Sequence, residues 1–186
     1  MSEAIGTLVP GWLAAAREPR VVAELELIFA EASRAIAARG PACWASGRCC
    51  NFDAAGHRLY ATGLETAYCL LRAGVPSQGD LAAAIARGGC PYQVLNLCGA
   101  HGHKPIGCRV YFCDRLAQAW QQELYERLLA ELRGLHERHA VSYVYAEWRG
   151  LLSAFVEGPS LADVPRFVVP NGGDRGGATP LTVRGQ

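Results

Sequence analysis

Hydrophobic residues recur every three or four positions along three stretches of the chain, which is the spacing of one face of an α-helix. The first stretch begins at Pro19 and ends at Gly40, where a glycine and then a proline stop a helix. The second begins near Asp114, and the third covers Val141–Phe155. Three amphipathic helices of this kind can bury a shared core, so the pattern predicts a mainly α-helical protein.

Two shorter helices are predicted between the first two long ones. Thr62–Glu65 matches a capping box, in which the threonine hydroxyl and the glutamate carboxylate bind free amides at a helix start. This helix is expected to run to about Arg72 and to end at Gly74. Asp80 is predicted to cap the second helix, Leu81–Arg87, which two glycines then stop.

The pattern changes again between residues 90 and 103, where Asn96 suits a turn between two short strands. Residues 157–186 contain six glycines and four prolines and are predicted to form a flexible tail. Phe167 and the two valines after it could dock locally or bind a partner, but the flexible tail is the favoured interpretation for them as well. The sequence therefore predicts a single helical domain over residues 1–156, with one short β-hairpin.

Composition narrows the class of protein. The 186 residues include 18 Lys+Arg and 17 Asp+Glu, a net charge of +1, which argues against nucleic-acid and membrane-surface binding. Hydrophobic residues make up 51%, enough for a packed core, and no apolar run approaches the roughly 20 residues that span a bilayer. The first residues lack the basic start of a secretory leader, so the expected compartment is the cytoplasm.

Eight cysteines stand out in a chain with one methionine. A disulfide framework is typical of short exported chains that cannot build a core, and neither property applies here. All eight cysteines lie between Cys43 and Cys113, in an irregular zone between the long helices. Reduced thiolates that bind a metal are the better interpretation.

The placement of the cysteines supports a metal site. Thiolate ligands must converge on one point, and several of these cysteines follow or precede a glycine, which lets the backbone approach closely or take positive φ. Free cysteine is also a common small core residue, and that reading is favoured for Cys69 inside a predicted helix. The predicted metal ligands are the other seven: Cys43, Cys49, Cys50, Cys90, Cys98, Cys108 and Cys113.

The identity of the metal is left open between zinc and an iron–sulfur cluster. Neither the paired Cys-x2-Cys spacing of zinc ribbons nor ferredoxin spacing is present. Seven thiolates exceed one tetrahedral site and are one short of two, so His101, three residues after Cys98, is a further candidate. The excess of thiolates slightly favours iron–sulfur.

Other candidate chemistry is sparse. His136 and His139 are close enough on a helix to share a metal, but a structural role near the helix end is favoured. Asp114 suits a helix cap as well as an acid–base role. The chain has no phosphate-binding glycine loop, dinucleotide fingerprint or nucleophile elbow, so no catalytic residue is identified. Whether the protein is an enzyme is left undecided.

The cysteine pattern resembles that of the YkgJ-type cysteine-cluster family, a zinc- or iron-chelating domain. The matching elements are a cysteine pair, a Cys-Pro-aromatic element, a cysteine before a basic residue and proline, and a Cys-Arg-x-aromatic-x-Cys element. In this chain they are Cys49-Cys50, Cys90-Pro91-Tyr92, Cys98 with Lys104-Pro105, and Cys108-Arg109-Val110-Tyr111-Phe112-Cys113. The chain departs from the family at two points. Lys104 stands where the family usually has an arginine, and only Cys43 precedes the cysteine pair, where the family often has a further cysteine. The second departure makes Cys69 or His101 a stronger candidate for a substitute ligand.

The resemblance implies a cysteine-ligated metal centre and no defined reaction. The leading hypothesis is a redox or electron-transfer protein with an iron–sulfur cluster. The alternative is a structural zinc module that acts by binding a protein partner, which the sequence does not identify. A related cysteine cluster occurs in flagellin lysine methylases, so an accessory part of a methyl-transfer enzyme is also kept as an alternative.

Overall fold

The structure is a computed structural model that describes residues 2–43, 47–158, 161 and 163–168. The described part is mainly helical, as predicted, and holds two small antiparallel sheets. Its α-helices are α1 (Ser2–Gly6), α2 (Val9–Ala15), α3 (Pro19–Arg39), α4 (Phe52–Ala55), α5 (Gly63–Ala73), α6 (Gln78–Ala86), α7 (Ile106–Val110), α8 (Gln118–Arg138) and α9 (Trp148–Val156). Its 3-10 turns are η1 (Arg48–Cys50) and η2 (Arg115–Ala117), and its strands are β1 (Tyr60–Thr62), β2 (Gln93–Val94), β3 (Leu97–Cys98) and β4 (Tyr145–Glu147).

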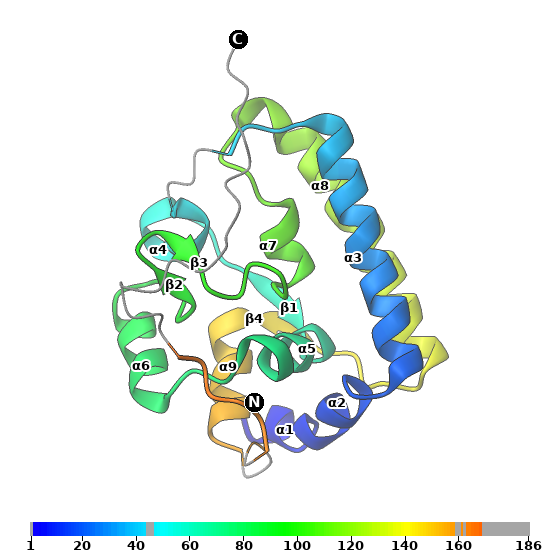
Figure 1. Ribbon diagram of the computed structural model, residues 1–186, viewed down its shortest axis with the longest axis vertical. Helices are drawn as coiled ribbons and strands as arrows, with labels where there is room; N and C mark the ends of the chain where they lie inside the picture. The colour runs from blue at the N-terminus through cyan, green and yellow to red at the C-terminus, as the bar shows by residue number, and fades with distance from the viewer. Residues whose placement is uncertain (1, 44–46, 159–160, 162, 169–186) are drawn as a thin grey trace.

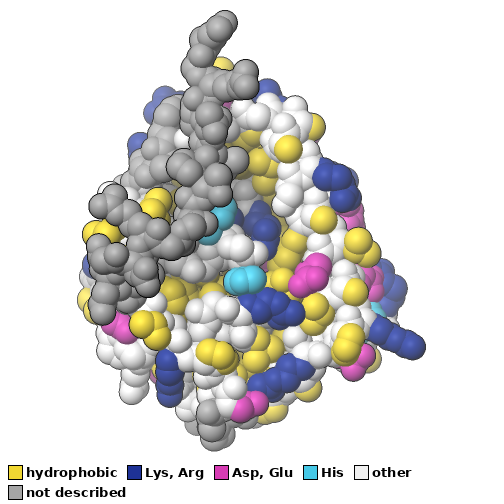
Figure 2. All heavy atoms as spheres, viewed as in Figure 1, with side chains coloured by type: hydrophobic (Ala, Val, Ile, Leu, Met, Phe, Trp, Pro, Cys, Tyr) yellow, Lys and Arg dark blue, Asp and Glu magenta, His cyan; other side chains and the backbone are white. Residues whose placement is uncertain are grey.

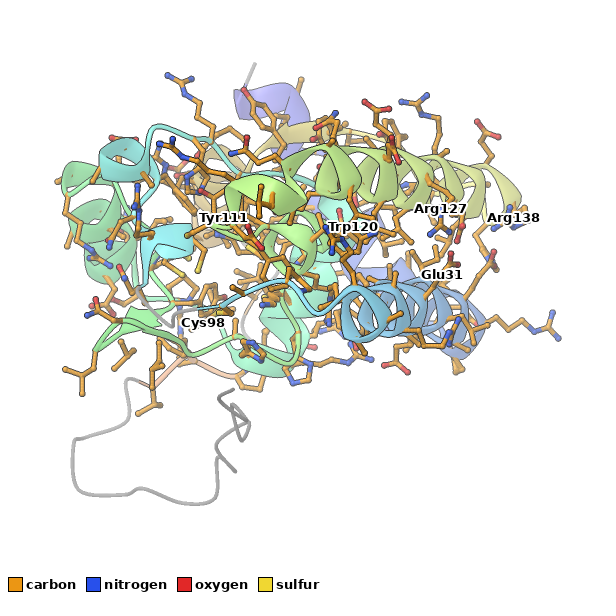
Figure 3. All side chains as sticks on the ribbon, turned by 90° about the horizontal axis from the view of Figure 1, so that it is seen from above. Glu31, Cys98, Tyr111, Trp120, Arg127 and Arg138 are labelled. Atoms are coloured by element: carbon orange, nitrogen blue, oxygen red, sulfur yellow. The ribbon has the colours of Figure 1, made fainter. Side chains whose placement is uncertain are left out.

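The two longest helices, α3 and α8, lie side by side along one edge of the molecule (Figure 1). Leu25 of α3 and Leu128 of α8 are fully buried, while charged residues of the two helices pair near the surface. Arg127 and Arg138 of α8 bind Glu31 and Glu24 of α3 (Figure 3). Exposed pairs of this kind contribute little, so burial of the apolar stripes holds these helices together.

The N-terminal helices α1 and α2 were not predicted from the sequence, and α2 supplies a core residue. The ring of Trp12 stacks on Phe155 of α9 with centroids 5.9 Å apart, and its Nε1 donates to the carbonyl of Ser142 at 2.7 Å. A Cβ on Gly63 would lie 2.2 Å from this ring, so the indole packs directly on the first turn of α5.

The third predicted helix is shorter than its apolar pattern indicates. Residues 141–144 are not helical, residues 145–147 form β4, and only Trp148–Val156 forms α9. Strand β4 pairs with β1 in antiparallel register, with Thr62 opposite Tyr145. The expectation of a helix from Val141 was therefore wrong. The backbone N–H and C=O groups of β4 pair with those of β1, a distant strand of the same chain, instead of forming a helical turn.

The helices within the cysteine zone follow the prediction closely at α5 and less so at α6. The capping box is present: Thr62 accepts from the Glu65 amide, and the Glu65 carboxylate accepts from the Thr62 amide at 2.8 Å. Helix α6 starts at Gln78, three residues earlier than predicted, because the side chain of Ser77 caps it. Asp80 is a first-turn residue of α6 and accepts a hydrogen bond from the Ser77 hydroxyl.

The predicted hairpin is confirmed. Strands β2 and β3 pair, and the two residues between them, Leu95 and Asn96, have φ values of 49° and 64°. Two successive positive φ values are typical of the tight turn whose twist suits a hairpin.

The segment after α9 does not form a free tail as far as the structure describes it. Leu161 and Val164 are buried, and the Val75 amide donates to the carbonyl of Pro165 at 2.7 Å. The ring of Phe167 packs edge-on against Tyr92 with centroids 4.8 Å apart. The predicted flexible tail is therefore wrong for residues 161 and 163–168, and residues 169–186 lie outside the described part of the chain.

In the parts of the chain that the structure covers, every helix is too short or too polar to cross a membrane.

Candidate metal centre

Cys50 lies at the centre of a group of thiols. It ends the 3-10 turn η1, is only 6% exposed, and is followed by the buried ring of Phe52. Gly47, before this turn, has a φ of 71°, a conformation that glycine takes without strain. The turn therefore directs Cys49 and Cys50 toward the interior, at the base of the β2–β3 hairpin.

Two backbone hydrogen bonds bring Cys90 to Cys50. The Cys90 amide donates to the carbonyl of Cys50 at 2.8 Å, and the Asp53 amide donates to the carbonyl of Gly88 at 3.0 Å. A Cβ on Gly89 would lie 3.2 Å from the Cys50 carbonyl oxygen, so the two segments nearly touch. The glycines before Cys90 thus allow the close approach that the sequence predicted for a ligand loop.

The β2–β3 hairpin supplies Cys98 and is fixed to the same turn. Gln93, opposite Cys98 in the hairpin, donates from Nε2 to the carbonyl of Gly47 at 3.1 Å. A Cβ on Gly47 would lie 2.7 Å from this Nε2 atom, which leaves no room for a larger residue. Three chain segments, each in an irregular or short element, therefore bring their cysteines to one place.

The four thiols interact with one another at Cys50. Cys50 shares hydrogen bonds with the sulfur atoms of Cys49, Cys90 and Cys98, and these bonds together with burial raise its pKa far above the ordinary value. The hydrogen bond from Cys50 lowers the pKa of Cys49 to about 6, against the effect of burial. The same donor lowers the pKa of Cys98 to about 7.

Cys69 and Cys108 lie beside this group, which we name the Cys50 cluster (Cys49, Cys50, Cys90 and Cys98). Cys69 is fully buried on α5, and Cys108 is half-buried on α7. Burial raises the pKa of both thiols, and the charges of Cys90 and Cys98 raise it further. Cys108 was expected in a loop, but it lies in a short helix.

Cys43 and Cys113 are not part of the cluster. Cys43 is exposed after α3, and Cys113 is half-buried in the segment between α7 and η2. In the described residues, neither thiol has a contact with Cys50 like those of Cys49, Cys90 and Cys98. The structure thus brings together four of the seven predicted ligands, with a fifth, Cys108, adjacent to them.

His101 has a different environment from the one expected of a ligand. It is exposed, and its amide donates to the carbonyl of Cys98 at 3.2 Å. The pKa of its imidazole is lowered chiefly by the charge of Lys104, then by burial and by Arg109. The charges that shift this pKa are therefore those of cations and not those of the thiols.

Positive charge lies close to the cluster. Lys104 helps to lower the pKa of both Cys49 and Cys98, and the amide of Ala100 donates to the Cys98 sulfur. Arg109 lies over the ring of Phe29 at 4.1 Å and donates to the carbonyl of Gly102. Figure 2 shows histidine side chains beside Lys or Arg side chains in the middle of one face. These donors and cations offset the negative charge that several thiolates carry.

Glu65, identified from the sequence only as a capping residue, also joins two elements around the site. One carboxylate oxygen binds the Thr62 amide, and the other accepts from the Ile106 amide, at the start of α7, at 2.8 Å. Burial is the main reason that its pKa is raised, and the three hydrogen bonds oppose this. This bond could not be predicted from the sequence, because Ile106 lies 41 positions from Glu65.

The side chains outside the zone have structural roles. Asp114 caps η2 by accepting from the Leu116 amide at 2.9 Å. His136 is buried with Nδ1 3.2 Å from the Val141 carbonyl, whereas His139 binds Glu24 at 2.7 Å. The two histidines thus have separate partners, in agreement with the structural interpretation.

The thiols converge without forming a ready metal site. Within residues 2–43, 47–158, 161 and 163–168, no three Cys, His, Asp or Glu side chains are arranged to hold a metal ion. The donor chemistry nevertheless fits a thiophilic metal, because the four sulfur atoms of the Cys50 cluster are the number that one tetrahedral ion or one cluster takes.

Comparisons with models of protein families, with curated proteins and with solved structures gave no match to this chain. The resemblance to the YkgJ-type family therefore remains a prediction from the cysteine motifs.

Proposed function

We propose that the protein binds a metal through the Cys50 cluster and acts in redox chemistry or electron transfer. The observation that carries this proposal is the convergence of Cys49, Cys90 and Cys98 on Cys50, which brings together four thiols from three separate chain segments. Cysteines that serve only as small core residues would not be expected to place four thiols next to one another. A metal would replace the protons of the ligating thiols, and small rotations of the four side chains would turn their sulfur atoms toward it.

An iron–sulfur cluster is the group that we favour. Six thiols lie within or beside the cluster when Cys69 and Cys108 are counted, more than one zinc ion requires. Lys104 and the Ala100 amide act on the sulfur atoms, and such donors raise the reduction potential of a cluster. When bound, the group would supply one-electron transfer, while the chain would set its burial and charge.

A structural zinc ion is the second candidate, and a different observation favours it. The four cysteines belong to η1, to the loop after α6 and to the β2–β3 hairpin, which are short elements with few residues each. A zinc ion would cross-link them and stabilise the fold by an amount on the order of 10 kcal/mol. The protein would then act by binding a partner.

Reduced thiols are required for either metal, so we propose the cytoplasm as the compartment.

Anaerobic purification followed by assay of iron, zinc and sulfide on one sample tests the proposal. We expect about one cluster per chain and a visible absorption band. Cys98→Ser and Cys90→Ser should lose the metal, while Cys43→Ser should keep it because Cys43 lies apart from the cluster. Far-UV circular dichroism of each variant separates loss of metal from loss of fold.

A colourless protein that holds one zinc ion per chain would replace redox chemistry with the structural role. Equal metal content in Cys98→Ser and Cys43→Ser, both folded, would show that the Cys50 cluster is not the site.

A further inference from the structure

A cavity of about 230 Å³ lies next to the cysteine cluster and has no role in the proposed metal binding. Aromatic side chains from four parts of the chain form much of its wall: β1, the segment after α7, helix α8 and β4. They are Tyr60, Tyr111, Tyr125 and Tyr145. Tyr111 lies near the end of α8 that is opposite Arg138 (Figure 3).

The aromatic wall is held in place before any ligand binds. Tyr60 and Tyr145 stack with centroids 5.5 Å apart, and His57 stacks on Tyr111 at 4.4 Å. The hydroxyls of Tyr125 and Tyr145 form a hydrogen bond of 2.5 Å. Rings fixed by one another lose little conformational freedom when they pack on a ligand.

The wall contains a side chain that can pair with an anion. The lining residues include Arg58 and no aspartate or glutamate, and the acidic group of the wall with a lowered pKa, about 6, is the Cys49 thiol. Arg58 is exposed, and the described residues show no ion pair or hydrogen bond to its guanidinium group. Gln121 accepts from the Phe112 amide through its carbonyl oxygen, which leaves its amide nitrogen as a second donor in the wall.

We propose that this cavity binds a small aromatic carboxylate. A planar ring would pack on the tyrosines, and the carboxylate would pair with Arg58, whose planar guanidinium group matches a carboxylate in two parallel hydrogen bonds. The volume is below the roughly 300–1,000 Å³ of pockets for drug-sized ligands, which limits the occupant to about one ring.

The inference goes beyond the proposed metal binding and does not depend on it. Cys49 and Cys108 also line the cavity, so a bound carboxylate would lie beside the metal centre. The tyrosines are held by ring contacts and a hydrogen bond that need no metal, and Arg58 directly precedes the buried Leu59. The choice of an aromatic carboxylate therefore rests on the tyrosines and Arg58, and not on the metal.

Titration of the ¹⁵N-labelled full chain with benzoate tests the proposal by NMR. We expect saturable shifts at the amides of Gly107 and Tyr111, which line the cavity. Benzamide has the same shape without the charge and should bind about tenfold more weakly or worse, as expected for loss of a charged hydrogen bond. Cyclohexanecarboxylate has the charge without the planar ring and should also bind more weakly.

Arg58→Gln should weaken benzoate binding about tenfold. Arg20→Gln is the matched control, because Arg20 is equally an exposed arginine but lies on α3 and outside the cavity. Both residues are exposed, so neither change should affect folding. Tyr111→Leu, which removes one ring of the wall, should weaken binding while Arg58 is retained.

Absence of shifts at Gly107 and Tyr111 with millimolar benzoate would overturn the inference, as would equal binding of benzoate and benzamide. Unchanged benzoate affinity in Arg58→Gln would also overturn it. The metal content of the same sample is measured separately, so benzoate binding without metal would leave this inference intact while contradicting the proposed function.

Discussion

At the scale of single residues, Gly88 shows how closely the segments that carry Cys50 and Cys90 approach each other. Its φ is 70°, and a Cβ there would lie 2.5 Å from a carboxylate oxygen of Asp53. Any other residue would have to bear a left-handed backbone and displace the Asp53 side chain. The position of Cys90 therefore depends on this glycine.

Gly88→Ala should lower the free energy of unfolding by about 2 kcal/mol, the cost of a left-handed conformation plus the displaced side chain. Gly102→Ala is the control, because a Cβ on Gly102 meets no atom within 4 Å. Its effect should be within about 0.5 kcal/mol. Urea unfolding of both variants measures this, and equal losses would contradict the account of the close approach.

The thiolate character of Cys49 should be visible in the metal-free protein. Its pKa is lowered to about 6, mainly by the hydrogen bond from Cys50, so it is a thiolate above that pH and a thiol below it. The rate of alkylation by iodoacetamide, followed by mass spectrometry of the Cys49 peptide, should reach half of its plateau near pH 6. In Cys50→Ala the midpoint should rise toward the ordinary value of 9.0; an unchanged midpoint would remove Cys50 as the donor.

Glu65 should make stability depend on pH in the opposite direction to an ion-paired carboxylate. Its pKa in the folded protein is raised above 4.5, chiefly by burial, so folding favours the protonated form. The stabilising contribution is full below 4.5 and is lost as the pH rises through the folded-state value. An amide cannot ionise, so the stability of the wild type relative to Glu65→Gln should fall as the pH rises from 4.5 through the folded-state pKa of Glu65. A relative stability that rises with pH would show that the hydrogen bonds outweigh burial.

At the scale of elements, the long helices illustrate what can be predicted from the sequence. The apolar spacing after Pro19 identified α3 to its last residue, because Gly40 ends it in a left-handed conformation with a φ of 62°. The capping box at Thr62 identified α5 for a similar reason. In both, the interactions that define the element lie within a few residues of one another.

The elements that were missed depend on distant contacts. Residues 145–147 continue an apolar pattern of helical spacing, yet they pair with β1, more than 80 positions earlier. Phe167 looked like part of a flexible tail, and its docking on Tyr92 is equally non-local. The same limit applies to the site: motifs identified the cysteines, but only the fold separates the Cys50 cluster from Cys43 and Cys113.

The α3–α8 pair should depend on its buried face and not on its surface charges. Leu128 of α8 is 0% exposed, whereas Leu27 of α3 is 66% exposed. Leu128→Ala should lower the free energy of unfolding by about 2–5 kcal/mol, because it leaves a cavity in the core. Leu27→Ala, the matched control, should change it by less than about 0.5 kcal/mol. Chemical denaturation followed by circular dichroism compares them, and similar losses would contradict the packing described for this pair.

At the scale of the whole molecule, the helical frame and the cysteine zone are stabilised by different kinds of interaction. The frame is built on buried apolar residues such as Leu25, Leu132 and Phe155. The zone around Cys50 consists of short turns and strands held by individual hydrogen bonds and by glycines that allow close approach. Such a zone gains most from a metal that joins its segments.

The central claim is that the Cys50 cluster holds a metal, and the metal content of two single variants tests it most directly. Cys50→Ser and Cys43→Ser are purified anaerobically beside the wild type, and iron, zinc and sulfide are assayed per folded chain. The account predicts that Cys43→Ser matches the wild type and that Cys50→Ser has lost its metal. Retention of the full metal content by folded Cys50→Ser, or a wild type that binds neither metal, would contradict it.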